Sequence, residues 1–183
     1  MNPLSDHSLM LQVRGGAVDK LGLLYDRYYS LVFSYFYNIF RDQALSKDLA
    51  QTVFMRILKY RERYREDGVF KHWMFRIARN IGRDQFQKQG RWRMEDAENW
   101  KDKLTASGSV QDDLIKREQL QQLHRALNEL DSEKREVLVL SKLEGMRYKE
   151  IAAILDCTEG AVKVKVYRAL KALKQVFISL ENQ

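Results

Sequence analysis

Apolar residues recur every three or four positions through most of this sequence, which is the spacing of one face of an α-helix. The first such stripe is made of Leu21, Leu24, Tyr25, Tyr28, Leu31, Val32, Tyr35, Phe36 and Ile39. The chain of 183 residues holds one proline, Pro3, and nine glycines, so few residues interrupt the helical pattern. We therefore expect an all-α fold.

Two further amphipathic helices follow the first stripe. The earlier one has Ser46 as a candidate N-cap, and its stripe is Leu49, Val53, Phe54, Ile57 and Leu58. The later one is expected from about Phe70 to Gln87, with a stripe of Phe70, Trp73, Met74, Ile77 and Ile81. The simplest interpretation of both stripes is that they form a hydrophobic core.

The helix that begins near Phe70 has a second face with a different composition. That face and the residues after it carry Lys71, His72, Arg76, Arg79, Asn80, Arg83, Gln87, Lys88, Arg91, Trp92 and Arg93. A charged loop, Arg61–Gly68, precedes the helix and contains Tyr64. Cations interleaved with aromatic rings suit single-stranded nucleic acid, because phosphates pair with the cations and bases stack on the rings.

A third pattern lies near the C-terminal end, where a short and a longer helix flank the break Asp156–Thr158. Asp156 tolerates a left-handed backbone, and the Thr158 hydroxyl can cap the second helix. One side of that helix carries Val162, Val166, Ala169, Leu170 and Leu173, and the other carries Val164, Tyr167, Arg168, Lys171 and Lys174. This is the pattern of a DNA-binding helix-turn-helix. The alternative is a helical hairpin with a solvated lysine face.

Charge divides the chain into three parts. Residues 1–92 carry 16 Lys and Arg against 9 Asp and Glu, residues 93–115 carry 3 against 6, and residues 116–183 carry 13 against 10. The acidic middle part lacks a sustained period and contains Thr-Ala-Ser-Gly-Ser, which is typical of a linker. We therefore expect two small helical domains joined by a flexible acidic linker. The net charge of +7 favours a polyanionic partner.

Several function classes are disfavoured. His7, His72 and His124 lie in separate segments, and Cys157 is the lone cysteine, so we expect no metal site and no disulfide framework. No glycine-rich phosphate loop is present, and we expect no catalytic residues and no cofactor. The sequence holds no bilayer-length apolar stretch and no apolar core of a secretory signal, so we expect a cytoplasmic protein without membrane insertion.

Three segments together resemble a known family. In order along the chain they are DLAQTVFMRILKY (Asp48–Tyr60), FKHWMFRIARNIGRDQFQKQGR (Phe70–Arg91) and Leu130–Leu173. They are similar to the polymerase-binding helix, the −10 element helix and the −35 element domain of bacterial RNA polymerase sigma factors of the sigma-70 superfamily. Only 23 residues separate the two basic parts, too few for the additional domain of a larger sigma factor, so the resemblance is to the small extracytoplasmic-function type.

The resemblance implies a function and partners. Residues 1–92 would be sigma domain 2, residues 93–115 a linker that threads the RNA path of the polymerase, and residues 116–183 sigma domain 4. Such a protein binds core RNA polymerase, reads a −35 duplex and a −10 single strand, and does no chemistry itself. Its partners would be core polymerase, promoter DNA and an anti-sigma factor. The rival interpretation is a duplex-binding transcriptional regulator with a sensory N-terminal domain.

The resemblance also implies site residues. Core polymerase would contact Asp48, Gln51, Thr52, Met55 and Arg56; the melted −10 strand would contact Tyr64, Lys71, Arg76, Arg79, Asn80 and Arg83. The −35 duplex would contact Lys163, Val164, Lys165, Tyr167, Arg168 and Lys171. Asn80 is the best candidate for contact with a flipped base, because an amide both donates and accepts hydrogen bonds.

Two departures from the family pattern affect these expectations. The common Gly-Thr-Val-Lys-Ser-Arg of the recognition helix is replaced by Gly160-Ala161-Val162-Lys163-Val164-Lys165. Val164 cannot donate a hydrogen bond but can contact a thymine methyl group, so the usual −35 consensus should not be assumed. Asp131 and Ser132 replace the proline that commonly starts the second helix of this domain, and both residue types cap helices well.

Overall fold

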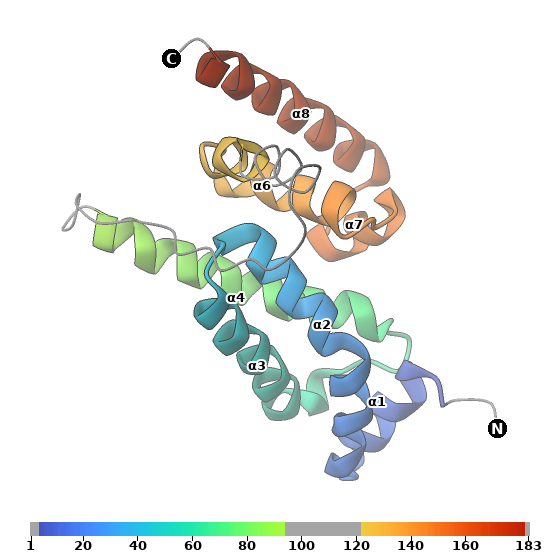
Figure 1. Cartoon of the computed structure of the whole chain (residues 1–183). Coiled ribbons are helices and arrows are strands. Elements are labelled where there is room, and N and C mark those ends of the chain that lie inside the picture. The colour runs from blue at the N-terminus through green and yellow to red at the C-terminus, as the bar shows by residue number, and fades with distance from the viewer. Residues whose placement is uncertain (1–3, 94–121, 182–183) are drawn as a thin grey trace, which may run out of the picture.

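The computed structural model describes residues 4–93 and 122–181, and every regular element in these two ranges is a helix, as the periodicity predicts (Figure 1). The N-terminal bundle contains α1 (Asp6–Arg14), η1 (Val18–Lys20), α2 (Leu21–Phe40), α3 (Gln43–Lys59), η2 (Arg61–Arg63) and α4 (Phe70–Arg93). The C-terminal bundle contains a helical segment at 122–128, then α6 (Ser132–Leu138), η3 (Val139–Leu143), α7 (Tyr148–Leu155) and α8 (Glu159–Glu181). The expected linker, residues 93–115, lies outside the described residues except for Arg93, where α4 ends.

The N-terminal bundle is built around α2, which packs against α1, α3 and α4. Its aromatic stripe forms core, as expected: Tyr35 and Phe36 are buried, and the Tyr35 ring meets the Phe75 ring of α4 edge-on with 5.5 Å between centroids. Val53 and Ile57 of α3 are also fully buried. Each such side chain contributes about 1.5–3 kcal/mol through burial, so packing rather than intrinsic propensity stabilises these helices.

The start of α3 differs from the sequence-based expectation. Its N-cap is Asp42, whose carboxylate accepts a hydrogen bond from the Leu45 amide at 2.9 Å, and not Ser46. Ser46 lies one turn inside the helix, where its buried hydroxyl donates to the Asp42 carbonyl. The helix begins earlier because Arg41 adopts a left-handed backbone, with φ of 56°, and so ends α2 directly before the Asp42 cap.

The C-terminal bundle confirms the local signals for its helices. Asp131 caps α6 by accepting a hydrogen bond from the Lys134 amide at 2.9 Å. Asp156 ends α7 in a left-handed conformation, with φ of 54°. The Thr158 hydroxyl then accepts a hydrogen bond from the Ala161 amide at 3.1 Å, which fixes the start of α8. The helix-turn-helix is therefore formed by α7 and α8.

The two bundles lie against each other. Helix α4 packs on α7, and α2 packs on η3. Figure 1 shows α2 and α4 in the middle of the molecule, with α3 on the side away from α8. Among residues 4–93 and 122–181, no element packs on the outer faces of α3 and α8, whereas the C-terminal bundle lies on one face of α4.

Candidate nucleic-acid and polymerase interfaces

The outer face of α8 and its edge present all six residues predicted to contact duplex DNA, and Lys165 at that edge also lies 3.4 Å from Glu133 of α6. They are all exposed: Lys163, Val164, Lys165, Tyr167, Arg168 and Lys171. Val164 is 48% exposed and Tyr167 is 69% exposed, which places an aliphatic and an aromatic surface among four cations. The combination can contact base edges, thymine methyl groups and phosphates in a major groove.

The inner face of α8 follows the expected stripe with one correction. Val162, Val166 and Ala169 are buried against α6 and α7. Leu170, expected on the packed side, is 40% exposed. At about 100° per residue, Leu170 lies roughly 80° around the helix from Val162, so it falls at the edge of the stripe.

The second predicted interface is the cationic face of α4, formed by Lys71, Arg76, Arg79 and Arg83. Asn80 lies on the same helix, and its side chain is exposed. The structure brings the four cations together along successive turns, as a single-strand contact requires. Each of the four also contacts the C-terminal bundle.

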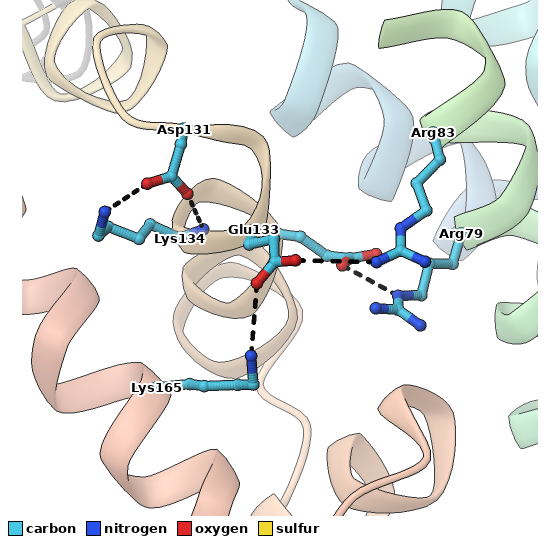
Figure 2. Close-up of polar contacts among 7 residues, drawn as sticks. Arg79, Arg83, Asp131, Glu133, Lys134 and Lys165 are labelled. Atoms are coloured by element: carbon cyan, nitrogen blue, oxygen red, sulfur yellow. Dashed lines mark hydrogen bonds and ion pairs between the residues drawn. The ribbon is translucent and has the colours of Figure 1, made fainter. Parts of the chain in front are cut away.

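The contacts of this face are specific ion pairs and hydrogen bonds. Arg79 Nε lies 3.1 Å from Glu136 Oε2 and Lys71 Nζ lies 3.0 Å from Glu150 Oε1, while Arg83 lies 3.9 Å from Glu133. The Arg79 and Glu136 side chains are only 18% and 11% exposed. Arg76 donates two hydrogen bonds, of 3.0 and 2.8 Å, to the Ala153 carbonyl of α7. Figure 2 shows Arg79 and Arg83 directed toward the start of α6.

The pKa values of two groups near this face, Tyr35 and Glu150, are shifted from their usual values. Burial, together with the neighbouring Glu136 carboxylate, raises the pKa of the Tyr35 hydroxyl well above its usual range, so Tyr35 donates to Glu136 Oε1 at 3.1 Å. Burial alone would raise the pKa of Glu150. Hydrogen bonds from the Arg147 amide and Lys71 nevertheless hold that pKa below its usual value. Glu150 therefore stays a carboxylate and keeps Lys71 as its partner.

The loop before α4 departs from its prediction at one residue. Tyr64, predicted to contact DNA, is only 1% exposed, and its hydroxyl donates to the Gly68 carbonyl at 2.7 Å. The ring packs against Trp73 with 5.2 Å between centroids. We correct the role of Tyr64 accordingly: its buried ring and its hydroxyl hold the loop from inside.

Helix α1 fixes the same loop from outside. His7 Nδ1 lies 3.0 Å from the Tyr64 hydroxyl. Arg14 donates to the Tyr64 carbonyl at 3.0 Å and forms an ion pair with Glu66 at 2.7 Å. The roles of His7 and Arg14 were not predicted, because no local pattern connects residues fifty or more positions apart.

The third predicted interface is the outer face of α3. Asp48 and Gln51 are exposed there, and Met55 is 68% exposed. Thr52 and Arg56 are half-buried and line a groove of about 360 Å³ between α3 and α4. The groove also contains Leu49, Ile81, Asp84, Gln85, Gln87 and Lys88, and Arg56 pairs with Asp84 at 3.2 Å. The structure therefore brings all five predicted residues onto one surface.

Sequence comparisons match both bundles to one family. The model of Sigma-70 region 2 matches residues 24–91, and the model of Sigma-70 region 4 matches residues 120–173. The RNA polymerase sigma factor CarQ of Myxococcus xanthus is 30% identical over 172 residues, which cover 94% of this chain and 97% of CarQ. The chain belongs to the sigma-70 family of RNA polymerase sigma factors.

Other relatives place this sigma factor in the extracytoplasmic-function type. The sigma factor BldN of Streptomyces coelicolor is 29% identical over 94% of this chain and 67% of its own length. The sigma-E factor of Escherichia coli K12 is 29% identical, with 93% of each chain covered. Both are named as sigma factors of that type, so the chain is a factor for promoter-specific transcription initiation. The region 2 match over the N-terminal bundle speaks against a sensory domain there.

Solved structures share the fold of this sigma factor. CnrH, in complex with the cytosolic domain of CnrY, has a TM-score of 0.67 and 23% identity, with 95% of this chain and 97% of CnrH covered. The sigma factor RpoE of Bartonella quintana, in complex with the anti-sigma factor NepR, has a TM-score of 0.65 and 23% identity, with 85% and 94% covered. Within the described residues of this sigma factor, no helix is both long and apolar enough to cross a membrane.

Proposed function

We propose that this sigma factor divides initiation among three surfaces: α3 binds core polymerase, α8 reads the −35 duplex, and α4 with its preceding loop holds the melted −10 strand. The observation that carries this proposal is the separation of two uncovered faces, on α3 and α8, by a cationic helix (Figure 1). A polymerase and a promoter can thus be held at the same time without competing for one surface.

Helix α8 supplies the duplex contacts in this scheme. Arg168 is exposed in the middle of the outer face and can grip a guanine edge with two hydrogen bonds. Val164 and Tyr167 supply apolar contact for thymine methyl groups. Lys163, Lys165 and Lys171 neutralise phosphates, a sequence-independent contribution.

Helix α4 supplies the single-strand contacts. Its four cations follow the backbone of the melted strand, and the exposed Asn80 amide reads the edge of a base. The loop before the helix holds a flipped base, and Tyr64 gives that loop its shape from inside.

Helix α3 supplies the polymerase contact. Met55 offers an apolar anchor, 68% exposed, next to a groove of about 360 Å³, and such a concave, partly apolar surface suits a protein helix.

Core polymerase and the chromosome share the cytoplasm, which is where this factor acts. The complexes of CnrH with CnrY and of RpoE with NepR support an anti-sigma factor as a further partner.

Binding to duplex promoters, measured with and without core polymerase, tests the proposal. Genomic fragments retained by the holoenzyme are selected, and the affinity of the isolated protein for the same fragments is then measured. A sigma factor that works by this scheme binds them tightly only as part of the holoenzyme. Equal affinity without polymerase would contradict the proposal and would favour an independent duplex-binding regulator.

A further inference from the structure

Val164 lies at the centre of the outer face of α8. At about 100° per residue, it lies roughly 160° around the helix from Val166. Val166 is buried in the core, whereas Val164 is 48% exposed. An aliphatic group, which neither donates nor accepts hydrogen bonds, therefore stands where this helix is proposed to meet the bases of the −35 duplex.

The residues around Val164 form an apolar centre with a cationic rim. Tyr167 follows it by three positions and is 69% exposed, and Arg168 follows it by four, so both are its neighbours on the helix surface. Lys163 and Lys171 are exposed on the same side of α8. The cations of the rim can contact phosphates on both sides of a groove while the apolar centre faces the base edges.

The turn before Val164 leaves room for a close approach of the DNA. Gly160 precedes Val164 by four positions, so it lies beside it on the helix surface, and it is exposed. A Cβ at Gly160 would lie 3.9 Å from the Thr158 hydroxyl oxygen, an ordinary contact distance, and the backbone there is not left-handed. Neither packing nor backbone conformation requires this glycine, and its lack of a side chain leaves Val164 accessible.

An aliphatic side chain in the major groove distinguishes bases through one group. Thymine presents a C5-methyl group beside its O4 acceptor, whereas guanine, adenine and cytosine present only hydrogen-bond donors and acceptors there. Because Val164 cannot hydrogen-bond, the methyl group is the feature that gives it a favourable contact. 5-Methylcytosine carries the same methyl group on the same carbon atom, although an amino group replaces O4.

We propose that the −35 site of this sigma factor selects a pyrimidine C5-methyl group through Val164, so that 5-methylcytosine can replace thymine at that position. This inference rests on the −35 role proposed for α8. It implies that methylation of a cytosine opposite Val164 strengthens recognition of a promoter.

Removal of one methyl group from the DNA tests the contact. In promoter fragments retained by the holoenzyme, each −35 thymine is replaced in turn by deoxyuridine, which keeps every hydrogen-bonding group. Affinity for the holoenzyme is measured by competition with a fluorescein-labelled parent fragment. We expect one replacement to weaken binding about three- to fivefold, the effect of burying one methyl group. No loss at any −35 thymine, or a −35 element without an A·T pair, would overturn the proposal.

Val164→Ala tests whether Val164 reads that methyl group. Alanine favours the helix more than valine does, so α8 should keep its structure, which circular dichroism checks. The holoenzyme with this variant should bind the thymine and deoxyuridine fragments with affinities that differ by less than about twofold. The matched control, Val18→Ala, truncates a valine of η1 that is 41% exposed and should keep the full difference. An undiminished difference in Val164→Ala would overturn the assignment.

A cytosine at the sensitive position tests the second half of the proposal. Fragments with cytosine or 5-methylcytosine there, each paired with guanine, differ in one methyl group. We expect the wild-type holoenzyme to prefer the methylated fragment about three- to fivefold, and the Val164→Ala holoenzyme to bind both alike. Equal wild-type affinities would overturn the proposal. If α8 does not read the −35 duplex at all, replacing the whole element with unrelated sequence will leave binding unchanged, whereas failure of methyl reading alone leaves that replacement damaging.

Discussion

His7 Nδ1 lies 3.0 Å from the Tyr64 hydroxyl, so the first helix of the chain holds the loop that precedes α4. The same nitrogen lies 3.2 Å from the Gly68 carbonyl, which accepts from Tyr64 at 2.7 Å. Arg14 adds a hydrogen bond to the Tyr64 carbonyl from the last turn of α1. Helix α1 is therefore part of the support for the proposed base-holding loop.

His7→Ala should reduce promoter melting by the holoenzyme. Loss of a hydrogen bond worth about 0.5–1.5 kcal/mol would lower the fraction of molecules in which the loop before α4 keeps its folded shape. The open-complex yield should then fall roughly two- to tenfold. Permanganate reactivity of −10 thymines measures this yield, and core binding should not change. His7→Gln, which can still hydrogen-bond to Tyr64, is the control and should stay closer to wild type. Equal yields for both variants and the wild type would show that α1 does not support the loop.

Asn80→Ala should impair melting without affecting duplex binding. The exposed Asn80 amide is proposed to offset part of the few kcal/mol needed to unpair and flip a base. Open-complex formation on linear promoters should fall, and a premelted −10 bubble should restore part of it, because the bubble removes the cost of unpairing. Wild-type permanganate reactivity of Asn80→Ala on linear promoters is the outcome that contradicts the assignment.

Arg168→Ala and Lys174→Ala should differ in how they affect promoter sequence preference. Arg168 is placed to contact a base edge, so its loss should cost about 1–3 kcal/mol and relax preference at one −35 position. Lys174 lies farther along α8 and is expected to touch phosphate only, so its loss should weaken all promoters alike. A promoter library transcribed by each variant separates the two. If both variants changed promoter preference in the same way, the separate roles of Arg168 and Lys174 would be contradicted.

The outer face of α3 can be tested by the double change Gln51→Ala with Met55→Glu. Met55 is 68% exposed, so thermal stability and helix content should stay almost unchanged. Core binding should weaken at least tenfold, which corresponds to about 1.4 kcal/mol. The control, Leu23→Glu, alters another exposed apolar residue, 45% exposed on α2, and should bind core normally. Co-elution of the double variant with core at wild-type affinity would exclude α3 as the docking surface.

The stability of the protein should fall between pH 7 and pH 5 because of His124. Burial, with a smaller contribution from the Arg41 charge, lowers the pKa of His124 from 6.5 to about 4. In this pH range, His124 is protonated in the unfolded chain but stays neutral in the folded chain. The free energy of unfolding therefore decreases as the pH falls. Urea titrations should show a loss of up to about 2 kcal/mol from this residue.

The control for this prediction is His124→Gln, which cannot take up that proton. Its overall stability can be lower, because the wild-type side chain is only 7% exposed, but its free energy of unfolding should depend less on pH in this range. The same pH dependence in variant and wild type would contradict the burial of a neutral His124.

Local signals in the sequence predicted most of the helices. Apolar spacing located α2, α3, α4 and α8, because a stripe that packs on a core repeats at the helical period. Asp156 and Thr158 identified the helix-turn-helix turn through conformations and hydrogen bonds that involve only near neighbours. The error at Ser46 arose because two capping residues, Asp42 and Ser46, stand one turn apart, and the choice depends on where α2 ends.

Contacts between distant segments could not be predicted in this way. The pairing of Arg79 with Glu136 joins residues 57 positions apart, and charge alone does not say which acid a given arginine meets. The burial of Tyr64 likewise depends on how α1 and α4 pack around it, whereas the sequence shows only a tyrosine in a charged loop. The exposure of the outer faces of α3 and α8 was therefore predictable, but the contact of the α4 cations with the C-terminal bundle was not.

This sigma factor directs core polymerase to specific promoters, and mapping the 5′ ends of transcripts is the most direct test of that function. Core RNA polymerase is supplied with genomic fragments, with and without the purified protein, and the starts are sequenced. We expect defined starts that appear only with the protein and share one −35 and one −10 element at fixed spacing. Identical start positions with and without the protein would contradict it.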